Sequence, residues 1–501
     1  MSIRFSWRPN QAHLISWREW NDAVADATAE DRPIFLCLTT SWCRWCQALD
    51  EGPLSDDVLI ATLNRAFVPA RVDVDERPDI ALRYSIGGWP TTAFLTPDGE
   101  TITGGTYFTT PELIEMSDNV LDIWQKHRED LAAEVAELQL ATTALLKATR
   151  ENPDKREISA DFIAFLTETA LSAHDSEYGG FGKGAKFPRT DILETLLEMR
   201  DDRSRSILNH TLDSLLAAPI RDRLGGGFYR YSATRDWSSP HTEKLLADNA
   251  ALASVMAQAS AALKRTDLAD EAIAIISFLD SAMWLPNAGL YRHSLPAFDE
   301  GDSMEINDER AYAISNAATV TALANVAATT GQAAPAKQAQ RLADTLWNTR
   351  SNRGLIAHET KGADCYLSTQ GNMLEALLAL HRQGDDEAQV RAEELWQAID
   401  SYFSVAGHSL LLADLAAPVN VPPESTYMYR ARVGRLSRTE TPLPDNARIA
   451  ACLAHLTDIT GDTAPRNRAR GMLEQLAPQA MAMGNYSIGL IRAALLAGLG
   501  R

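Results

Sequence analysis

The stretch Trp42-Cys43-Arg44-Trp45-Cys46 places two cysteines two residues apart, directly after the apolar residues 34–38. This order predicts a strand that ends just before the pair and a helix that begins at it. The N-terminus of a helix carries partial positive charge, which stabilises a thiolate on the first cysteine. Because only a thiolate attacks a disulfide, the position favours redox chemistry at Cys43 and Cys46. The alternative is one half of a zinc site.

The composition limits the classes of function. The chain has 501 residues, enough for two to four domains with large cores, and 45% of them are hydrophobic. Its formal net charge is −20. Nonspecific nucleic-acid binding needs an excess of Lys and Arg to replace counterions, and binding to anionic membranes needs the same sign of charge. We therefore expect neither nucleic acid nor a membrane as a partner.

The cysteines are few and scattered. There are five, an odd number that does not fit a secreted disulfide framework: Cys37, Cys43, Cys46, Cys365 and Cys452. No second pair with the same spacing completes a four-cysteine zinc site, so zinc would need distant histidines. The N-terminus lacks a signal-peptide core, and no apolar run of 18 residues follows. We expect a soluble cytoplasmic protein with no metal or cofactor.

Further signals surround the cysteine pair. Residues 66–74 and 87–95 are typical of strands, Asp98-Gly99 predicts a hairpin, and helical patterns cover residues 17–29 and 43–64. This order resembles thioredoxin, in which a cis-proline faces the dithiol and pairs with an incoming peptide. Trp89-Pro90 lies where that proline is expected. The resemblance implies that Cys43 and Cys46 are catalytic, and that five residues shape the redox site: Trp42, Arg44, Trp45, Trp89 and Pro90.

Two positions depart from the thioredoxin pattern. Thioredoxins carry a buried Asp six residues before the first cysteine, where it helps proton transfer at the second, and this chain has Cys37 there. We interpret Cys37 as a small core residue, with a third redox thiol as the alternative. Arg44 replaces a small turn residue and should lower the pKa of Cys43 electrostatically. Thiolate formation is thus supported, and proton transfer at Cys46 less so.

From about residue 119 the pattern becomes helical, beginning with a long polar helix over residues 122–149. A weak repeat follows, in which residues 227–232 are echoed by residues 289–294 and 354–358, with a degenerate copy at Gly180-Phe181. Between these copies, apolar helical segments carry Asn249, Asn316, Asn372 and Asn446. About twelve helices from residue 157 onward predict six helical hairpins that close into a toroid, because no single hairpin can bury its own apolar face.

The Gly-aromatic segments should lie at one rim of this toroid, where loops on a rigid scaffold commonly build sites. Ser239 resembles a helix N-cap with Pro240 at the first helical position, which would place the next residues in the first turn. Such a turn is either a capped helix start with solvated charges or an acid–base or sugar-binding site. The pocket candidates are Tyr229, Arg230, His241, Glu243, Lys244, Asp248, Asn249, His293 and His358.

The chain also resembles the thioredoxin-domain proteins of the spermatogenesis-associated protein 20 type. This resemblance rests on residues 5–7, 43–46, 72–79, 87–90, 95–99, 104–108, 179–182, 186–188, 224–228, 240–245 and 248–250. It implies an α/β thioredoxin-like domain over residues 1–118, a connecting helix over 119–156, and an all-α (α/α)6 toroid over 157–501. Such toroids are shared with sugar epimerases and glycosidases. The resemblance fades beyond about residue 310, and Arg44 and Gln47 stand where the family usually has histidines.

Three functions follow as hypotheses. The first is a thiol–disulfide oxidoreductase that uses Cys43 and Cys46 on a protein or small-molecule disulfide, with the toroid recruiting the substrate. The second is a carbohydrate epimerase or glycosidase in the toroid, regulated by the dithiol, for which His241, His293 and His358 are the candidate histidines. The third is a non-catalytic module that binds a saccharide or peptide.

Overall fold

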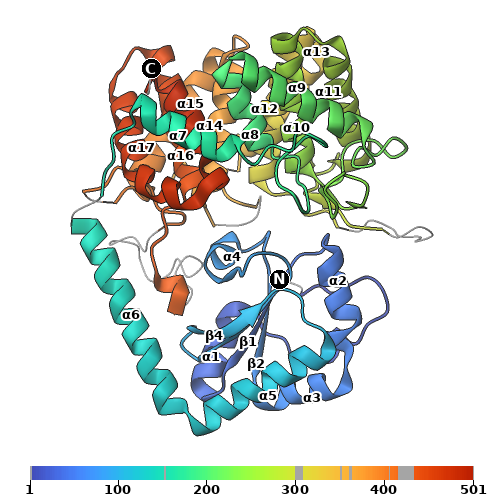
Figure 1. Cartoon of the computed structure of the whole chain (residues 1–501), viewed down its shortest axis with the longest axis vertical. Coiled ribbons are helices and arrows are strands. Elements are labelled where there is room, and N and C mark those ends of the chain that lie inside the picture. The colour runs from blue at the N-terminus through green and yellow to red at the C-terminus, as the bar shows by residue number, and fades with distance from the viewer. Residues whose placement is uncertain are drawn as a thin grey trace. The chain divides into compact units, whose positions relative to one another are not determined.

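The chain forms two units, each described here by itself. The computed structural model describes residues 3–151, 154–298, 308–349, 353–359, 364–405, 407–415 and 434–499. The first unit comprises Met1–Glu151 and Ala417–Thr439, and the second comprises Asn152–Ala416 and Glu440–Arg501. Figure 1 shows the α/β composition of the first unit and the helical composition of the second.

A four-stranded sheet organises the first unit. Its strands are β1 (Ile34–Thr39), β2 (Val68–Asp73), β3 (Thr91–Leu95) and β4 (Thr101–Gly105), in the order β2-β1-β3-β4. Strand β1 runs parallel to β2 and antiparallel to β3, and β3 runs antiparallel to β4. A single parallel bridge joins Arg18 to Ala70 beyond the β2 edge. Every residue of β1 is buried, as expected for a central strand covered on both faces.

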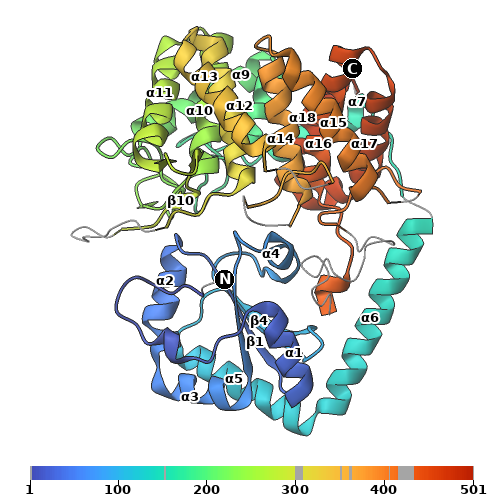
Figure 2. The same cartoon turned by 180° about the vertical axis from the view of Figure 1, so that it is seen from behind.

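Helices cover both faces of this sheet (Figures 1 and 2). On one face, α1 (Trp20–Glu30) and α4 (Pro78–Tyr84) pack on Leu36 and Val72. On the other, α2 (Arg44–Glu51), α3 (Asp57–Ala66) and α5 (Thr110–Lys126) pack on Phe35 and Phe94. This is the thioredoxin-like arrangement that the sequence predicted.

Two predicted helices are each divided in the structure. The single helix expected over residues 43–64 ends at Glu51, because Pro53 cannot continue it, and a short 3-10 turn leads to α3, which Asp56 caps. The long helix expected over residues 122–149 is also two helices. The first is α5, which begins at Thr110, and α6 (Arg128–Glu151) follows after the non-helical residue His127.

A segment from late in the chain completes the first core. The 3-10 turn η4 (Gly434–Ser437) places Leu436 in the cluster formed by α1, α4 and the sheet. The guanidinium of Arg438 donates to Glu100 at 2.7 Å, and the Arg83 side chain donates to the Arg438 carbonyl at 2.9 Å. The thioredoxin-like unit is therefore built from two separate parts of the sequence.

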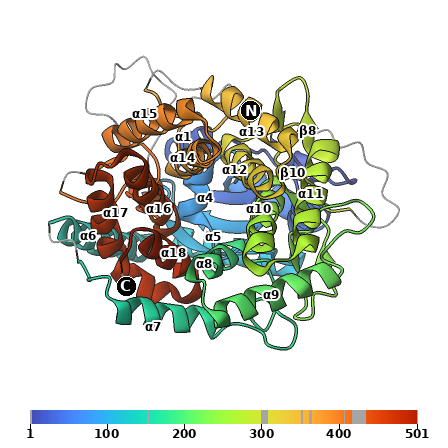
Figure 3. The ribbon, with the colours of Figure 1, turned by 90° about the horizontal axis from the view of Figure 1, so that it is seen from above.

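The second unit contains twelve α-helices among its described residues. The six inner helices are α8 (Thr190–Met199), α10 (Leu246–Leu263), α12 (Ala313–Thr330), α14 (Leu367–His381), α16 (Leu443–Thr460) and α18 (Ile488–Leu496). Each packs against the next, and α18 returns to α8, which closes the ring (Figure 3). The outer helices are α7 (Ala160–Leu171), α9 (Asp202–Ala217), α11 (Thr266–Phe278), α13 (Ala333–Trp347), α15 (Asp386–Phe403) and α17 (Ala464–Met483). This is the expected (α/α)6 toroid.

Short strand pairs precede the inner helices. The expected helix start at Ser239 and Pro240 is wrong, because Pro240–His241 forms strand β6, which pairs with β5 (Tyr231–Ser232). Helix α10 begins only at Leu246, after a second two-residue strand, β7 (Lys244–Leu245). The Asp, Trp and Ser residues before Pro240 therefore belong to the loop of a β-hairpin and do not cap a helix.

Among the described residues, no helix is both long enough and apolar enough to span a lipid bilayer.

Candidate functional site

Cys43 is the N-cap residue of α2. Its backbone is extended, and its Sγ accepts a hydrogen bond from the Cys46 backbone N–H at 3.4 Å. The sulfur thus lies at the positive end of the helix dipole, where a thiolate is favoured over a thiol. Cys43 is only 3% exposed. The Cys43 residue is thus nearly covered by the groups around it.

The loop before β3 faces this sulfur. The Cys43 Sγ–H donates to the Trp89 carbonyl at 3.6 Å, and the bond between Trp89 and Pro90 is cis, as the sequence predicted. Thr91 fixes the loop, since its hydroxyl donates to the Gly88 carbonyl at 2.8 Å. The backbone next to Cys43 is consequently held in place by these bonds.

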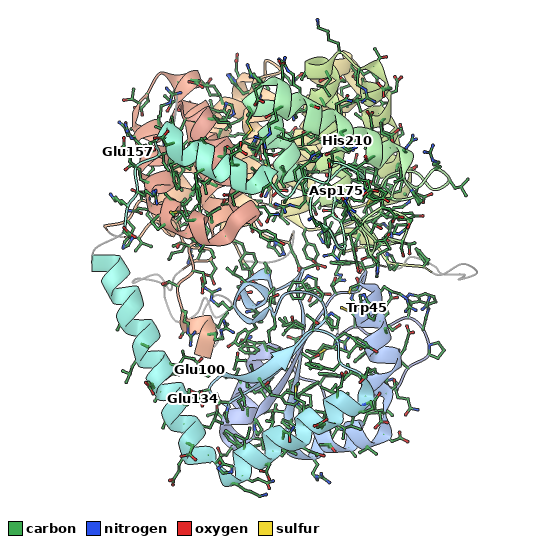
Figure 4. The ribbon with its side chains drawn as sticks, in the orientation of Figure 1. Trp45, Glu100, Glu134, Glu157, Asp175 and His210 are labelled. Atoms are coloured by element: carbon green, nitrogen blue, oxygen red, sulfur yellow. The ribbon has the colours of Figure 1, made fainter. Side chains whose placement is uncertain are left out.

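The aromatic residues of the motif differ in their surroundings. The Trp42 indole N–H donates to Asp75 at 2.8 Å, and the Thr40 hydroxyl donates to the same carboxylate oxygen at 2.6 Å. Trp45, labelled in Figure 4, is 46% exposed, and its ring centroid lies 5.2 Å from that of Tyr107. Trp42 is therefore a fixed wall of the site, and Trp45 presents an apolar surface beside it.

Arg44 has an acidic neighbour on its own helix. Its Nη1 lies 3.7 Å from a Glu51 carboxylate oxygen. Glu51 also accepts from the Ser6 hydroxyl at 2.8 Å. The positive charge of Arg44, expected to act on Cys43, is thus shared with a carboxylate one to two turns further along α2.

Cys46 and Cys37 lie deeper than Cys43. Burial raises the pKa of the Cys46 thiol well above its usual value, and the hydrogen bond with Cys43 raises it further. Burial raises the pKa of Cys37 to about 12. Cys37 is fully buried among the apolar residues of the α3 and α5 face, which fits its interpretation as a core residue. The sulfur atoms of Cys43 and Cys46 are not joined by a disulfide in this structure.

A buried ion pair lies beside Cys46, and the sequence analysis did not identify it. Arg71 on β2 donates two parallel hydrogen bonds to Asp50 on α2, at 2.7 and 2.8 Å. The Asp50 side chain is 1% exposed and that of Arg71 is 5% exposed. Two signals could have found the pair. Asp50 follows Cys46 by one helical turn, and Arg71 is the one charged residue among the apolar residues 66–72.

Cys46, Asp50 and Arg71 line one cavity of about 60 Å³ that opens to solvent. Four buried polar atoms of its lining residues have no protein partner within the described part of the chain: Trp20 Nε1, Asn21 Oδ1, Gln47 Oε1 and Arg71 Nε. Buried polar groups of this kind are commonly satisfied by water. The cavity therefore gives Cys46 polar neighbours.

In the toroid, one group of predicted residues comes together before α10. Arg230 Nη1 lies 3.7 Å from Glu243, whose side chain is 1% exposed. Glu243 Oε2 has no hydrogen-bond partner among the described residues. Burial raises the pKa of Glu243, and it raises the pKa of Asp248 to about 6, against the opposing charges of Arg230 and His293. Two carboxyl groups, an arginine and a histidine thus share one electrostatic site.

The predicted histidines belong to aromatic stacks. The His241 ring stacks on Tyr231 at 4.2 Å, and Tyr231 stacks in turn on Phe187 at 4.8 Å. His358 stacks on Tyr312 at 4.9 Å, and His293 meets the edge of the same ring at 5.0 Å. His293 and His358 therefore share Tyr312, whereas His241 lies in a separate stack.

Lys244 and Tyr229 contact each other and a Gly-rich turn of the toroid. Lys244 Nζ donates to Asp222 at 2.6 Å and to the Gly226 carbonyl at 2.7 Å, and it lies 5.0 Å from the Tyr229 ring. Lys186 makes the same pair of bonds to Asp175, which is labelled in Figure 4, and to the Gly179 carbonyl. We interpret both lysines as structural residues that stabilise repeated Gly-rich turns.

Asn249 fastens a Gly-aromatic segment to an inner helix. Its side chain accepts from the Phe228 N–H at 2.7 Å and donates to the Phe228 carbonyl at 3.0 Å. Asn316 and Asn446 bind Tyr291 and Leu411 in the same way.

Asn372 lies in an apolar helix, α14, as the sequence predicted, but it does not make this contact. The side chain of Gln370 bonds both backbone groups of Ile356 at 2.8 Å, and Asn372 donates to the Ser368 carbonyl on its own helix. Position within the helix decides the role, because Asn249, Asn316, Gln370 and Asn446 are each the fourth residue of their helix. The contact at Leu411 also reveals a further copy of the segment, which the sequence pattern did not indicate because Ser409 stands where the copies at residues 289–294 and 354–358 begin with glycine.

Comparisons with known proteins agree with both units. Residues 7–143 match the family model Thioredox_DsbH, described as "Protein of unknown function, DUF255". The chain is 31% identical to spermatogenesis-associated protein 20 of Mus musculus over 303 residues, which cover 55% of this chain and 38% of that protein. The protein of the same name from Homo sapiens is 30% identical over 300 residues. These matches confirm the resemblance that the sequence motifs indicated.

The match covers well under half of the length of these curated relatives, 38% in both cases. Among solved structures, a D-mannose isomerase superposes with a TM-score of 0.50 at 12% identity, covering 63% of this chain and 85% of that chain. Identity this low supports the toroid fold alone.

Proposed function

We propose that this chain is a thiol–disulfide oxidoreductase that uses Cys43 as the nucleophile and Cys46 as the resolving thiol. The observation that carries the proposal is the position of Cys43, whose sulfur caps α2 and faces the Trp89 carbonyl. A thiolate at a helix N-terminus is stabilised, and a buried second thiol beside it is typical of such pairs. We place the activity in the cytoplasm, because five scattered cysteines do not fit a secreted disulfide framework.

The proposed reaction exchanges one disulfide for another. The Cys43 thiolate attacks a substrate disulfide, forms a mixed disulfide and releases the first substrate thiolate. The Cys46 sulfur then attacks Cys43 Sγ, and the second substrate sulfur leaves with the electron pair of the broken bond. The substrate is thereby reduced to two thiols, and the protein is left with a Cys43–Cys46 disulfide. The partner is a protein or small-molecule disulfide, and the toroid serves in recognition.

A redox titration tests this proposal. When the whole chain is equilibrated in buffers of reduced and oxidised glutathione, its intact mass should fall by the two hydrogens lost as Cys43 and Cys46 join. Peptide mapping should locate the bond between these two residues. The Cys37→Ser variant is the matched control and should oxidise in the same way, because Cys37 is a core residue. A wild-type chain that stays fully reduced, or one that oxidises through Cys37, contradicts the proposal.

A second candidate function belongs to the toroid and is favoured by Glu243 and Asp248. Two carboxyl groups with raised pKa values beside Arg230 and His293 suit proton transfer at a carbon next to a sugar carbonyl. The aromatic stack of Phe187, Tyr231 and His241 would suit a sugar ring. The third function, binding of a saccharide or peptide without turnover, uses the same residues.

Saccharide turnover separates these toroid functions. We expect isomerisation or epimerisation of an aldose from a substrate panel to fall about 10²-fold or more in Glu243→Gln, which is the size of a general acid–base contribution. If Asp248 is the base, turnover should also fall as the pH drops below about 6, since its carboxyl group is then protonated. Saccharide binding without turnover supports the binding module, and neither binding nor turnover contradicts both toroid functions.

A further inference from the structure

We propose that Asp50 is the proton acceptor for Cys46 in the resolving step, and that Arg71 positions its carboxylate for this task. The inference rests on the proposed oxidoreductase function and adds an acid–base residue to it. It also assigns a role to the buried ion pair, which the exchange of disulfides described above does not use.

Cys46 and Asp50 lie on the same helix and line the same cavity. Cys46 and Asp50 are four residues apart on α2, so their side chains lie on the same face of the helix, one turn apart. Both line the same cavity, together with Arg71 from β2. The cavity is lined by polar groups and opens to solvent, so a water molecule can link the thiol to the carboxylate. Proton transfer through one water is within the ordinary reach of a general base.

The Asp50 carboxylate is held in a fixed orientation by its neighbours. Asp50 receives both guanidinium bonds of Arg71 and also a hydrogen bond from the Ser6 N–H at 2.7 Å. The Arg71 guanidinium carbon lies 4.8 Å from the centre of the Phe5 ring and 5.5 Å from that of Trp17. Three hydrogen bonds therefore hold the Asp50 carboxylate, and turning it away from the cavity would break them.

Cys46 needs a proton acceptor before it can react. A thiol that is buried and hydrogen-bonded to its partner holds its proton tightly, as the raised pKa of Cys46 indicates. It must nevertheless lose that proton before it can attack the mixed disulfide. The nearby Cys37 cannot serve, because burial holds its own pKa at about 12. Asp50 supplies a carboxylate on the face of α2 that Cys46 occupies.

Other charged and titratable groups also face this cavity. They come from the N-terminal segment, the start of α1, the end of β2 and the loop after it, and they are Arg4, Glu19, Asp73, Glu76 and Arg77. Cys43 on α2's N-cap and Cys37 on β1 also interact electrostatically with Cys46. Arg71 interacts electrostatically with Asp50, Cys37 and Cys46 together, so it couples the carboxylate to both buried thiols.

The proposed step balances. The proton of the Cys46 S–H passes through cavity water to the Asp50 carboxylate, and the sulfur keeps its electron pair. That pair forms the bond to Cys43 Sγ. The bond between Cys43 and the substrate sulfur breaks, and the substrate leaves as a thiolate. Asp50 then releases its proton to solvent through the cavity, and the substrate thiolate takes up a proton from solvent.

DTNB separates the two chemical steps in the full-length chain. Attack by Cys43 releases the first equivalent of the coloured thiolate, and resolution by Cys46 releases the second. In Asp50→Asn we expect the first phase to change less than twofold and the second to slow about 100-fold at pH 7. The second phase should then rise about tenfold per pH unit, because the thiolate fraction of Cys46 follows hydroxide. The matched control is Glu51→Gln, which removes the neighbouring carboxylate and should leave the second phase unchanged.

If Asp50→Asn fails to fold, Arg71→Lys provides a second variant, because it retains the positive charge next to Asp50. It loses one of the two parallel bonds, so the second phase should slow several-fold while the first is unchanged. A second phase with wild-type rate and pH profile in the folded variants overturns the role of Asp50. A wild-type chain that releases no second equivalent instead overturns the proposed function, so the two failures are distinguishable.

Discussion

The Cys43→Ser variant is expected to lose disulfide reduction, with a fall in the catalysed rate on the order of 10³-fold or more, as found when a nucleophile is removed. A hydroxyl group at the N-cap of α2 would keep the hydrogen bond from the Cys46 N–H, but it does not attack sulfur at neutral pH. The measurement is reduction of insulin by the chain with dithiothreitol as the electron donor, followed by turbidity.

The other cysteines provide matched controls for this prediction. Cys37 is a fully buried core residue, and Cys452 lies in the inner helix α16 of the toroid. Neither takes part in the proposed exchange, so Cys37→Ser and Cys452→Ser should keep activity within about twofold wherever they fold. Activity in Cys43→Ser above a tenth of the wild-type rate would show that another thiol is the nucleophile.

The second large effect concerns stability. In Arg71→Ala we expect the free energy of unfolding of the thioredoxin-like unit to fall by about 3–5 kcal/mol, because Asp50 is left as a buried charge without its partner. The chain has two units, so a global melt is not two-state. Urea-dependent hydrogen exchange of the β1 and β2 amides reports on this unit alone.

Two further variants make the stability prediction specific. Arg128 pairs with Asp31 at the surface of the same unit, where both side chains are about half exposed, so Arg128→Ala should change the exchange little. The double variant with Asp50→Leu and Arg71→Met should recover most of the lost stability, because an apolar pair of similar volume avoids the cost of buried charge. Equal loss in Arg71→Ala and Arg128→Ala would contradict the account of this ion pair.

The sequence predicted the strand, the helix start and the loop around the cysteine pair because their signals are local, whereas the redox role of the pair stays a prediction. An apolar strand, a cysteine at a helix start and an X-Pro bond are read from a few neighbouring residues, and the structure places Cys43, Trp89 and Pro90 together. The role of Asp50 depends on a partner 21 residues away on β2 and on Ser6 far upstream. The sequence marks Asp50 and Arg71 as unusual positions, but it does not show that they pair with each other or with Ser6.

In the toroid, too, the sequence predicted the helices better than the contacts of single residues. The number of helices follows from periodicity, but the contact that each residue makes does not, so the bonds of Gln370 to Ile356 could not be read from the sequence. Ser239 and Pro240 have the composition of a helix start, yet pairing of β6 with β5 determines their conformation. In both cases a tertiary contact with another segment overrides the local signal.

Trapping of the mixed disulfide tests the central claim most directly. The Cys46→Ser variant, treated with oxidised glutathione, is predicted to gain one glutathione that peptide mass spectrometry locates on Cys43 and that persists until a reductant is added. Under the same conditions the wild-type chain should pass to the Cys43–Cys46 disulfide and retain no adduct. An adduct on Cys37 or any other cysteine, or no adduct on Cys43, would contradict the assignment of Cys43 as nucleophile and Cys46 as resolving thiol.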